Sequence, residues 1–408
     1  MQRNHSDSRK ALIVGGSLGG LFAANLLLRS GWDVTVLERS PDELAGRGAG
    51  IVTHPELFDA LTAAGVEVNE DIGVTVHSRI TLNADGSSAA TCPLTQTLTA
   101  WSKMFHILRA ALPDACYRSG AIVEDVVSFD DHAEVKLSDG DTLQADLVVA
   151  ADGFRSAIRQ KFLPDVPLQY AGYIAWRGLV DERDLSPQTW TTLFDKFGFC
   201  LPSGEQMLGY PVAGPGNSTQ PGERRYNFVW YRPTDETVAL RDLLTDATGK
   251  YHANGIPPHL IRADVLADMR DAAHSLLSPE FAEVVAKTKQ PLFQPIYDLE
   301  ATRLVFDRVV LLGDAAFVAR PHCGMGATKA AGDATQLARS LATSASVGDA
   351  LADYERQRLQ FGTAIVEHAR HLGAYMQAQM KSELERAMAE KYRTPEAVMR
   401  ETAVAPQL

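Results

Sequence analysis

The first 40 residues alternate between apolar runs and turn residues in the order of a strand–helix–strand unit. Residues 11–14 form a short apolar run, which predicts a strand buried on both faces of a sheet. Residues 21–30 are mostly apolar and are followed by Gly31, a residue that commonly ends a helix. Residues 33–38 read as a second strand, so we predict a βαβ unit at the start of the chain.

Further apolar runs predict where the later elements lie. Runs at 147–151 and 309–312 predict two more buried strands, and the pairs Asp85-Gly86 and Asp139-Gly140 predict hairpins. Residues 170–232 are rich in aromatic and β-branched side chains, which predicts a β-rich region. Helical spacing predicts helices over residues 55–64, 102–112, 261–287, 325–341 and 351–391.

Composition narrows the class of protein. The 39 Lys+Arg and 51 Asp+Glu residues give a net charge of −12, which argues against non-specific binding to nucleic acid or to an anionic membrane. No run approaches the roughly 18 apolar residues of a membrane span, and residues 1–7 contain no apolar signal segment. The four cysteines, Cys92, Cys116, Cys200 and Cys323, are far apart. We therefore expect a cytoplasmic protein without a metal site, and a homodimer is compatible with this composition.

A glycine-rich turn joins the first strand to the first helix. In the pattern Gly15-x-Ser17-x-x-Gly20, Gly15 permits a tight turn, the small Ser17 lets a diphosphate approach, and Gly20 lets helix and strand pack closely. The free N–H groups of the helix N-terminus favour an anion. Glu38 ends the next strand and can accept a hydrogen bond from an unphosphorylated ribose. The pattern indicates a site for FAD or NAD rather than NADP.

The two later buried strands each end in a carboxylate. Asp152-Gly153 follows one strand and Gly313-Asp314 follows the other, and open α/β sheets bind ligands at the carboxyl ends of their strands. Asp314 could accept a hydrogen bond from a ribitol hydroxyl. Gly324 and Gly326 open the following helix, whose N-terminus suits the negative edge of a reduced flavin.

The order and spacing of the three motifs resemble the flavoprotein hydroxylases of the para-hydroxybenzoate hydroxylase type, from residue 10 to about residue 375. The segments 38–41, 50–52, 170–178 and 313–322 are similar to the branch of this family that hydroxylates dihydroxypyridines. The resemblance implies an α/β fold: a Rossmann-like FAD-binding domain, a β-rich substrate domain and a C-terminal helical segment. We place the FAD-binding domain at 1–165, with a substrate-domain insertion around 71–100, and at 291–345. The substrate domain then spans 166–290 and the helical cover 346–408.

The resemblance also implies a reaction and its site residues. FAD is bound non-covalently and reduced by NADH or NADPH, and a flavin C4a-hydroperoxide hydroxylates a small hydroxylated aromatic or N-heteroaromatic ring, such as a dihydroxypyridine. Polar residues expected beside the flavin are His54, Tyr210 and His322, and a histidine suits removal of a phenol-type proton near neutral pH. For Tyr210, packing in the core is an equally good interpretation. The residues expected to bind the cofactor are Gly15, Ser17, Leu18, Gly20, Glu38, Arg39, Gly50, Ile51, Val52, Asp152, Gly313, Asp314, Pro321, Gly324, Met325, Gly326 and Ala327.

Two other functions remain open from the sequence. One is a different FAD oxidoreductase, a halogenase or an epoxidase, although the W-x-W-x-I-P motif of flavin halogenases is absent and Trp176-Arg177-Gly178 stands in its place. The other is a non-catalytic flavin-binding sensor, which would bind FAD without consuming NAD(P)H. A plain NAD dehydrogenase would not need the Gly313-Asp314 segment.

Overall fold

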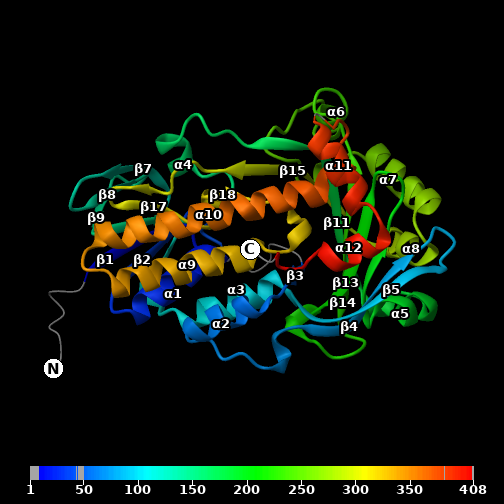
Figure 1. The fold of residues 1–408 in the computed structure, drawn as a ribbon, viewed down its shortest axis with the longest axis horizontal. Coiled ribbons are helices and arrows are strands. Elements are labelled where there is room, and N and C mark those ends of the chain that lie inside the picture. Colours follow the sequence, from blue (N-terminus) through cyan, green and yellow to red (C-terminus); the bar gives the residue numbers. More distant parts are fainter. Residues whose placement is uncertain (1–8, 43, 45–49, 381, 407–408) are drawn as a thin grey trace.

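The computed structural model describes residues 9–42, 44, 50–380 and 382–406 (Figure 1). Within these residues a first sheet has the strand order β16-β17-β10-β1-β2-β6, in which all neighbours are parallel except β16 and β17. Its strands are β1 (Lys10–Val14), β2 (Asp33–Glu38), β6 (Tyr117–Ser119), β10 (Leu147–Ala150), β16 (Val305–Phe306) and β17 (Val309–Leu311). The predicted βαβ unit and both later buried strands are confirmed.

The second sheet is larger and mostly antiparallel, with the order β18-β15-β11-β14-β13-β12-β4-β5-β3 among the described residues. Its strands are β3 (Gly50–Val52), β4 (Val74–Leu82), β5 (Ser88–Ala100), β11 (Gln169–Asp181), β12 (Lys196–Cys200), β13 (Gln206–Val212), β14 (Arg225–Pro233), β15 (Leu292–Glu300) and β18 (Phe317–Val318). The predicted insertion around 71–100 thus lies in this sheet. So do β15 and β18 of the predicted segment 291–345, and the two proposed domains share the sheet.

Helices cover the sheets, and a small third sheet of β7 (Val123–Ser128), β8 (Ala133–Leu137) and β9 (Thr142–Ala145) lies beside the first one. In Figure 1, the long helix α10 runs from the region of the first sheet toward the second, with α9 alongside it. The helices are α1 (Leu18–Arg29), α2 (Pro55–Ala63), α3 (Trp101–Ala111), α4 (Ala157–Phe162), α5 (Pro187–Leu193), α6 (Ala239–Leu243), α7 (Ala263–Leu276), α8 (Pro279–Lys287), α9 (Gly326–Thr343), α10 (Val347–Gly373), α11 (Glu383–Tyr392) and α12 (Pro395–Glu401).

Two predicted helices are broken in the structure. The stretch 261–287 divides into α7 and α8, because the Ser278 hydroxyl caps a new helix and Pro279 occupies its first position. The stretch 351–391 divides at the end of α10, and α11 begins only after Ser382, which forms a capping box with Glu385. Caps of this kind override the apolar spacing that runs across both breaks.

The two faces of the second sheet pack against different partners. Side chains such as Trp176, Trp230 and Phe293 form a core with α7 and α8. On the other face, Tyr173 and Tyr231 belong to a separate core that includes residues of β3 and of the C-terminal segment. Successive strand residues point to opposite faces, so this alternation decides which side chains of β11 face the FAD-binding half of the molecule.

Helix α10 crosses β18 closely at Gly362, where an added Cβ would lie 2.3 Å from the Phe317 ring. We predict that Gly362→Ala lowers the free energy of unfolding by about 1–3 kcal/mol, because the buried ring must move to admit the methyl group. The matched control is Gly348→Ala in the first turn of the same helix, where no ring is near and the substitution should be neutral or stabilising. Midpoints of urea unfolding, followed by circular dichroism, measure both; equal midpoints would contradict the prediction.

Candidate active site

A pocket of about 280 Å³ lies at the carboxyl ends of β1, β2 and β10. Gly15, Ser17, Glu38, Arg39 and Asp152 line it, so the structure brings together residues that the sequence placed in two separate motifs. This edge is where parallel sheets of this kind hold nucleotides. Leu18 and Gly20 are buried at the start of α1, next to the pocket rather than in its lining.

The turn before α1 requires its glycines. Gly15 has φ +106°, and a Cβ there would lie 2.3 Å from the carbonyl oxygen of Ala151. A Cβ on Gly20 would lie 1.9 Å from the carbonyl oxygen of Gly15. The side chain of Ser17, the N-cap of α1, accepts no capping hydrogen bond, which leaves the first N–H groups of the helix available to an anion such as a diphosphate.

The two carboxylates of this pocket differ in their partners. Both oxygens of Glu38 accept hydrogen bonds of 2.8 Å, one from the N–H of Gly16 and one from the N–H of Ser40. Asp152 has a buried Oδ1 without a partner among the described residues, and burial raises the pKa of its carboxyl. A ribose or ribitol hydroxyl would supply the missing donor, so the chemistry of the pocket fits the nucleotide part of FAD.

The Gly313-Asp314 turn lies farther along the same sheet edge. Gly313 has φ +66° and donates its N–H to Asp333 at 3.0 Å. Asp314 is half-exposed, and its Oδ1 lies 3.7 Å from the Nζ of the buried Lys329. Loss of solvation raises the pKa of the Asp314 carboxyl, and the charge of the Lys329 ammonium opposes that rise. Asp314 and Pro321 line a second pocket of about 580 Å³, between the first sheet and β15.

Residues 50–54 lie against the loop and helix start at 321–328. A Cβ on Gly50 would lie 2.8 Å from the Tyr210 hydroxyl oxygen, and one on Gly324 would lie 3.1 Å from the Cβ of Val52. The Nδ1 atom of His54 lies 3.0 Å from the Thr328 hydroxyl. The structure therefore assembles the following predicted residues in one region: Gly50, Ile51, Val52, His54, Tyr210, Pro321, His322, Gly324, Met325, Gly326 and Ala327.

His54 and His322 are both buried, and each uses one ring nitrogen. His322 Nε2 lies 2.7 Å from the Tyr173 hydroxyl, and the Tyr231 ring centroid is 4.5 Å from the imidazole. The other ring nitrogens, His54 Nε2 and His322 Nδ1, are buried without a partner among the described residues. Each free nitrogen can donate or accept a hydrogen bond, depending on the tautomer.

Burial keeps both histidines neutral. It lowers the pKa of His54 to about 4, and it lowers the pKa of His322 to about 3, with the charges of Arg320 and Arg177 acting in the same direction. A histidine of such low basicity is poorly matched to a phenol-type proton, which differs from the expectation of a base titrating near neutral pH. Burial also raises the pKa of Tyr210, so this phenol is neutral as well.

Sequence reasoning missed the partners that hold these side chains. Tyr173 is 149 residues from His322, and Thr328 is 274 residues from His54. Lys329, between Asp314 and Asp333, was also not singled out. No local pattern in the sequence marks such long-range pairs.

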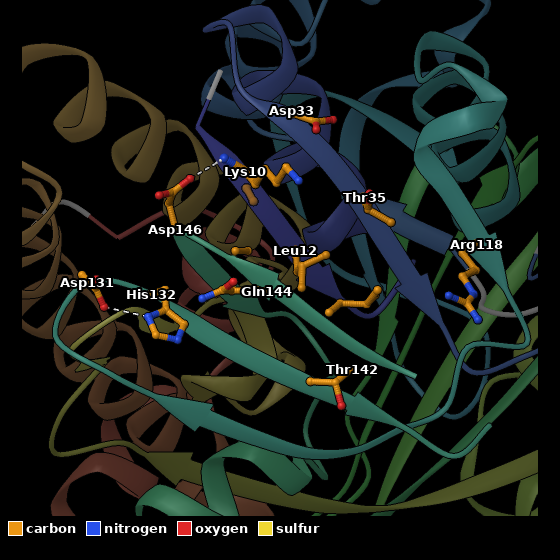
Figure 2. A pocket seen from close by; sticks show the side chains of 13 residues that line it. Lys10, Leu12, Asp33, Thr35, Arg118, Asp131, His132, Thr142, Gln144 and Asp146 are labelled. Atoms are coloured by element: carbon orange, nitrogen blue, oxygen red, sulfur yellow. Dashed lines mark hydrogen bonds and ion pairs between the residues drawn. The ribbon is translucent and has the colours of Figure 1, made fainter. Parts of the chain in front are cut away.

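Another hollow, of about 660 Å³, lies at the amino ends of β1 and β2, facing β9 and the loop before β8 (Figure 2). Many of its charges already have partners: Asp146 accepts from the backbone N–H of Lys10 at 2.7 Å, and His132 lies 2.6 Å from Asp131. Arg118 pairs with Asp139 at 2.6 Å. None of the predicted site residues lines this hollow, and it lies at the edge opposite the nucleotide pocket.

In the part of the chain that the structure describes, no helix is long and apolar enough to cross a membrane. Nor do the described His, Cys, Asp and Glu side chains form a group of three or more that could hold a metal ion.

Comparisons with known proteins agree with the assignment of an FAD site. A family model described as an FAD binding domain matches residues 8–194 and 259–369, and a second, described as FAD binding domain-like, matches 170–298. The chain is 32% identical to 2,6-dihydroxypyridine 3-monooxygenase of Paenarthrobacter nicotinovorans over 90% of this chain and 91% of the relative. It is 30% identical to aurachin C monooxygenase/isomerase of Stigmatella aurantiaca over 89% and 88%, respectively.

A solved structure shares the whole architecture. The structure of 2,6-dihydroxypyridine-3-hydroxylase from Arthrobacter nicotinovorans superposes with a TM-score of 0.85 at 29% identity, covering 92% of this chain and 94% of that one. The resemblance inferred from the motifs is confirmed, and FAD is the cofactor that the matched family binds. The chain belongs to the FAD binding domain family and is an FAD-dependent monooxygenase of the para-hydroxybenzoate hydroxylase type.

Proposed function

We propose that this enzyme hydroxylates a small hydroxylated aromatic or N-heteroaromatic ring, with a dihydroxypyridine as the first candidate, using NAD(P)H and O2. The observation that carries the proposal is the pair of buried histidines, each with one free ring nitrogen, next to the segments expected to hold the flavin. A dihydroxypyridine offers ring N–H and hydroxyl groups to such nitrogens. The similarity to 2,6-dihydroxypyridine 3-monooxygenase supports the same class of ring.

The residues of this chain would bind and orient the ring and keep water away from it. When bound, FAD supplies the reduction and oxygen chemistry. The nucleotide pocket, with Gly15, Glu38 and Asp152, would hold the adenosine part, and Asp314 would accept from the ribitol chain. Tyr173 and Thr328 would fix the two histidine rings, so that each free nitrogen meets the substrate in one orientation.

The test of the function is a substrate screen. The purified protein should show the visible spectrum of bound flavin, and hydroxypyridines should accelerate NAD(P)H oxidation over the basal rate. We expect stopped-flow reduction of the flavin to be faster with 2,6-dihydroxypyridine present, because the chain has no second glycine-rich nucleotide motif and NAD(P)H must visit the flavin transiently. Equal rates with and without every aromatic tested would favour the flavin-binding sensor instead.

Asp314→Ala should weaken FAD binding by about 10- to 100-fold, because it removes a charged hydrogen-bond acceptor from the ribitol position. The substitution removes no core volume, since the side chain is half-exposed, so the fold should persist. Asp268→Ala, an exposed carboxylate on α7, is the control. Equilibrium titration of the apoprotein with FAD measures both variants, and an Asp314→Ala protein with wild-type affinity would refute the assignment.

His54→Ala and His322→Ala should each lower kcat/KM by roughly one to two powers of ten while FAD stays bound, because each leaves a polar group of the ring unpaired. Hydrogen peroxide release per NAD(P)H consumed should rise, since a misplaced ring intercepts less of the activated oxygen. His77→Ala, an exposed histidine of β4, serves as the control. Coupled hydroxylation at the wild-type rate in both buried-site variants would show that these anchors are wrong.

The remaining features stay predictions. We propose a cytoplasmic location from the cysteine spacing, and a homodimer is compatible with the composition. The domain boundaries given above are our proposal for how the FAD-binding and substrate parts divide.

A further inference from the structure

Arg79 is a fully buried arginine of β4 that binds the C-terminal segment of the chain. Its Nη1 atom donates to the carbonyl oxygens of Met399 at 2.8 Å and of Thr402 at 2.5 Å. Its Nη2 atom donates to the carbonyl oxygen of Ala403 at 3.4 Å. A buried cation is costly unless it is hydrogen-bonded, so these bonds hold the C-terminal segment against the second sheet.

A ring and an amide complete the surroundings of the guanidinium. The Cζ atom of Arg79 lies 4.8 Å from the centroid of the Phe197 ring. Gln96 accepts from Arg79 at 2.7 Å and donates to the Ala403 carbonyl oxygen at 2.8 Å. The Ala403 carbonyl therefore has two donors, one charged and one neutral.

The hydrogen bonds from Arg79 change how α12 ends. Thr402 is the C-cap of this helix, and Ala403 follows in the left-handed conformation, with φ +58°. In a helix that ends in this way, the N–H of the left-handed residue donates to the carbonyl four residues earlier, here that of Met399. That carbonyl instead accepts from Arg79. The Ala403 N–H donates to the carbonyl oxygen of His322 at 2.7 Å.

His322 connects the C-terminal segment to the ring site. Its Nε2 atom lies 2.7 Å from the Tyr173 hydroxyl, and its backbone carbonyl accepts from Ala403. The backbones are packed closely here, because a Cβ on Gly324 would lie 3.3 Å from the Cα of Ala403. A shift of the C-terminal segment would therefore move the loop that carries His322.

We propose that Arg79 is a positioning residue for the ring site. It occupies the Met399 carbonyl, which would otherwise cap the helix. The Ala403 N–H then donates to His322 and fixes its imidazole beside Tyr173. Arg79 touches neither the ring nor the flavin and acts through the C-terminal segment. The inference rests on the proposed function only where it concerns the ring that His322 would bind.

The first test measures amide hydrogen exchange on the holoenzyme without any ring present. Arg79→Met removes the guanidinium, so the Ala403 N–H should turn back to the Met399 carbonyl and release His322. We expect deuterium uptake of the peptides that carry His322 and Ala403 to become about tenfold faster, because hydrogen bonds at both places are lost or exchanged. Unchanged uptake in both peptides would overturn the proposal.

Two further variants separate this effect from a general loss of stability. Gln96→Leu removes the neutral partner of the Ala403 carbonyl and leaves the buried cation in place, so it should show a smaller rise in the same peptides. If Arg79→Met does not fold, unchanged uptake in Gln96→Leu overturns the proposal instead. Arg262→Met is the matched control, because Arg262 at the start of α7 also donates to a backbone carbonyl, that of Thr245 at 3.1 Å. It should leave both peptides unchanged.

The second test is a double-mutant cycle on binding of the ring. 2,6-Dihydroxypyridine is titrated without oxygen or NAD(P)H into the wild-type holoenzyme, Arg79→Met, His322→Ala and the double variant, and the flavin difference spectrum is followed. Arg79→Met should weaken binding by about tenfold with unchanged FAD content. It should add less than about twofold to the effect of His322→Ala, because both changes act on the same contact. Full additivity of the two changes would overturn the proposal.

A parallel cycle with His54→Ala separates the charge of Arg79 from its hydrogen bonds. Burial lowers the pKa of His54, and the charge of Arg79 acts in the same direction. If Arg79→Met is additive with His322→Ala but not with His54→Ala, Arg79 acts by its charge and the proposal is wrong. If the wild-type protein does not bind 2,6-dihydroxypyridine, the proposed ring fails, whereas the exchange measurements still test the role of Arg79.

Discussion

The hydrogen bond of 2.7 Å between His322 Nε2 and the Tyr173 hydroxyl connects the two halves of the molecule at the point where the site forms. It ties the loop after β18 to the centre of the second sheet. The backbone adds a second connection, because His322 accepts from the N–H of Ala403 at 2.7 Å. The C-terminal segment is thereby held against the same loop.

The end of α10 shows how little room this contact leaves. A Cβ on Gly373 would lie 2.4 Å from the Tyr173 hydroxyl and 2.9 Å from His322 Nε2. A glycine is therefore needed where the helix passes the pair. The same crowding excludes water, and it accounts for the strongly lowered pKa of His322, because the charged imidazolium would lose its solvation without gaining an acidic partner.

Charge around the site is arranged in two ways. Most buried ions are compensated: Asp298 accepts from both Arg320 and Arg370, and Asp333 accepts from Arg358 at 2.6 Å. Among the described residues, the buried Arg79 and Arg159 donate mainly to backbone carbonyl groups rather than to carboxylates, and Arg177 lines a cavity with its Nε unpartnered.

The sequence by itself determined the βαβ unit, the nucleotide-binding turn and the family, because these depend on short-range spacing. Gly15, Gly20 and Glu38 lie within one βαβ unit, and each carboxylate motif directly follows a buried strand. The N-caps at Ser278 and Ser382, which begin α8 and α11, are also local, but the apolar spacing continues across them and does not reveal the two breaks.

Only the tertiary structure decided what each polar side chain meets. His54 and Thr328, like His322 and Tyr173, are far apart in the chain and become neighbours only when β3, β11 and the start of α9 converge. The neutrality of the histidines follows from burial at that convergence, which depends on the packing of the two sheets rather than on any local pattern.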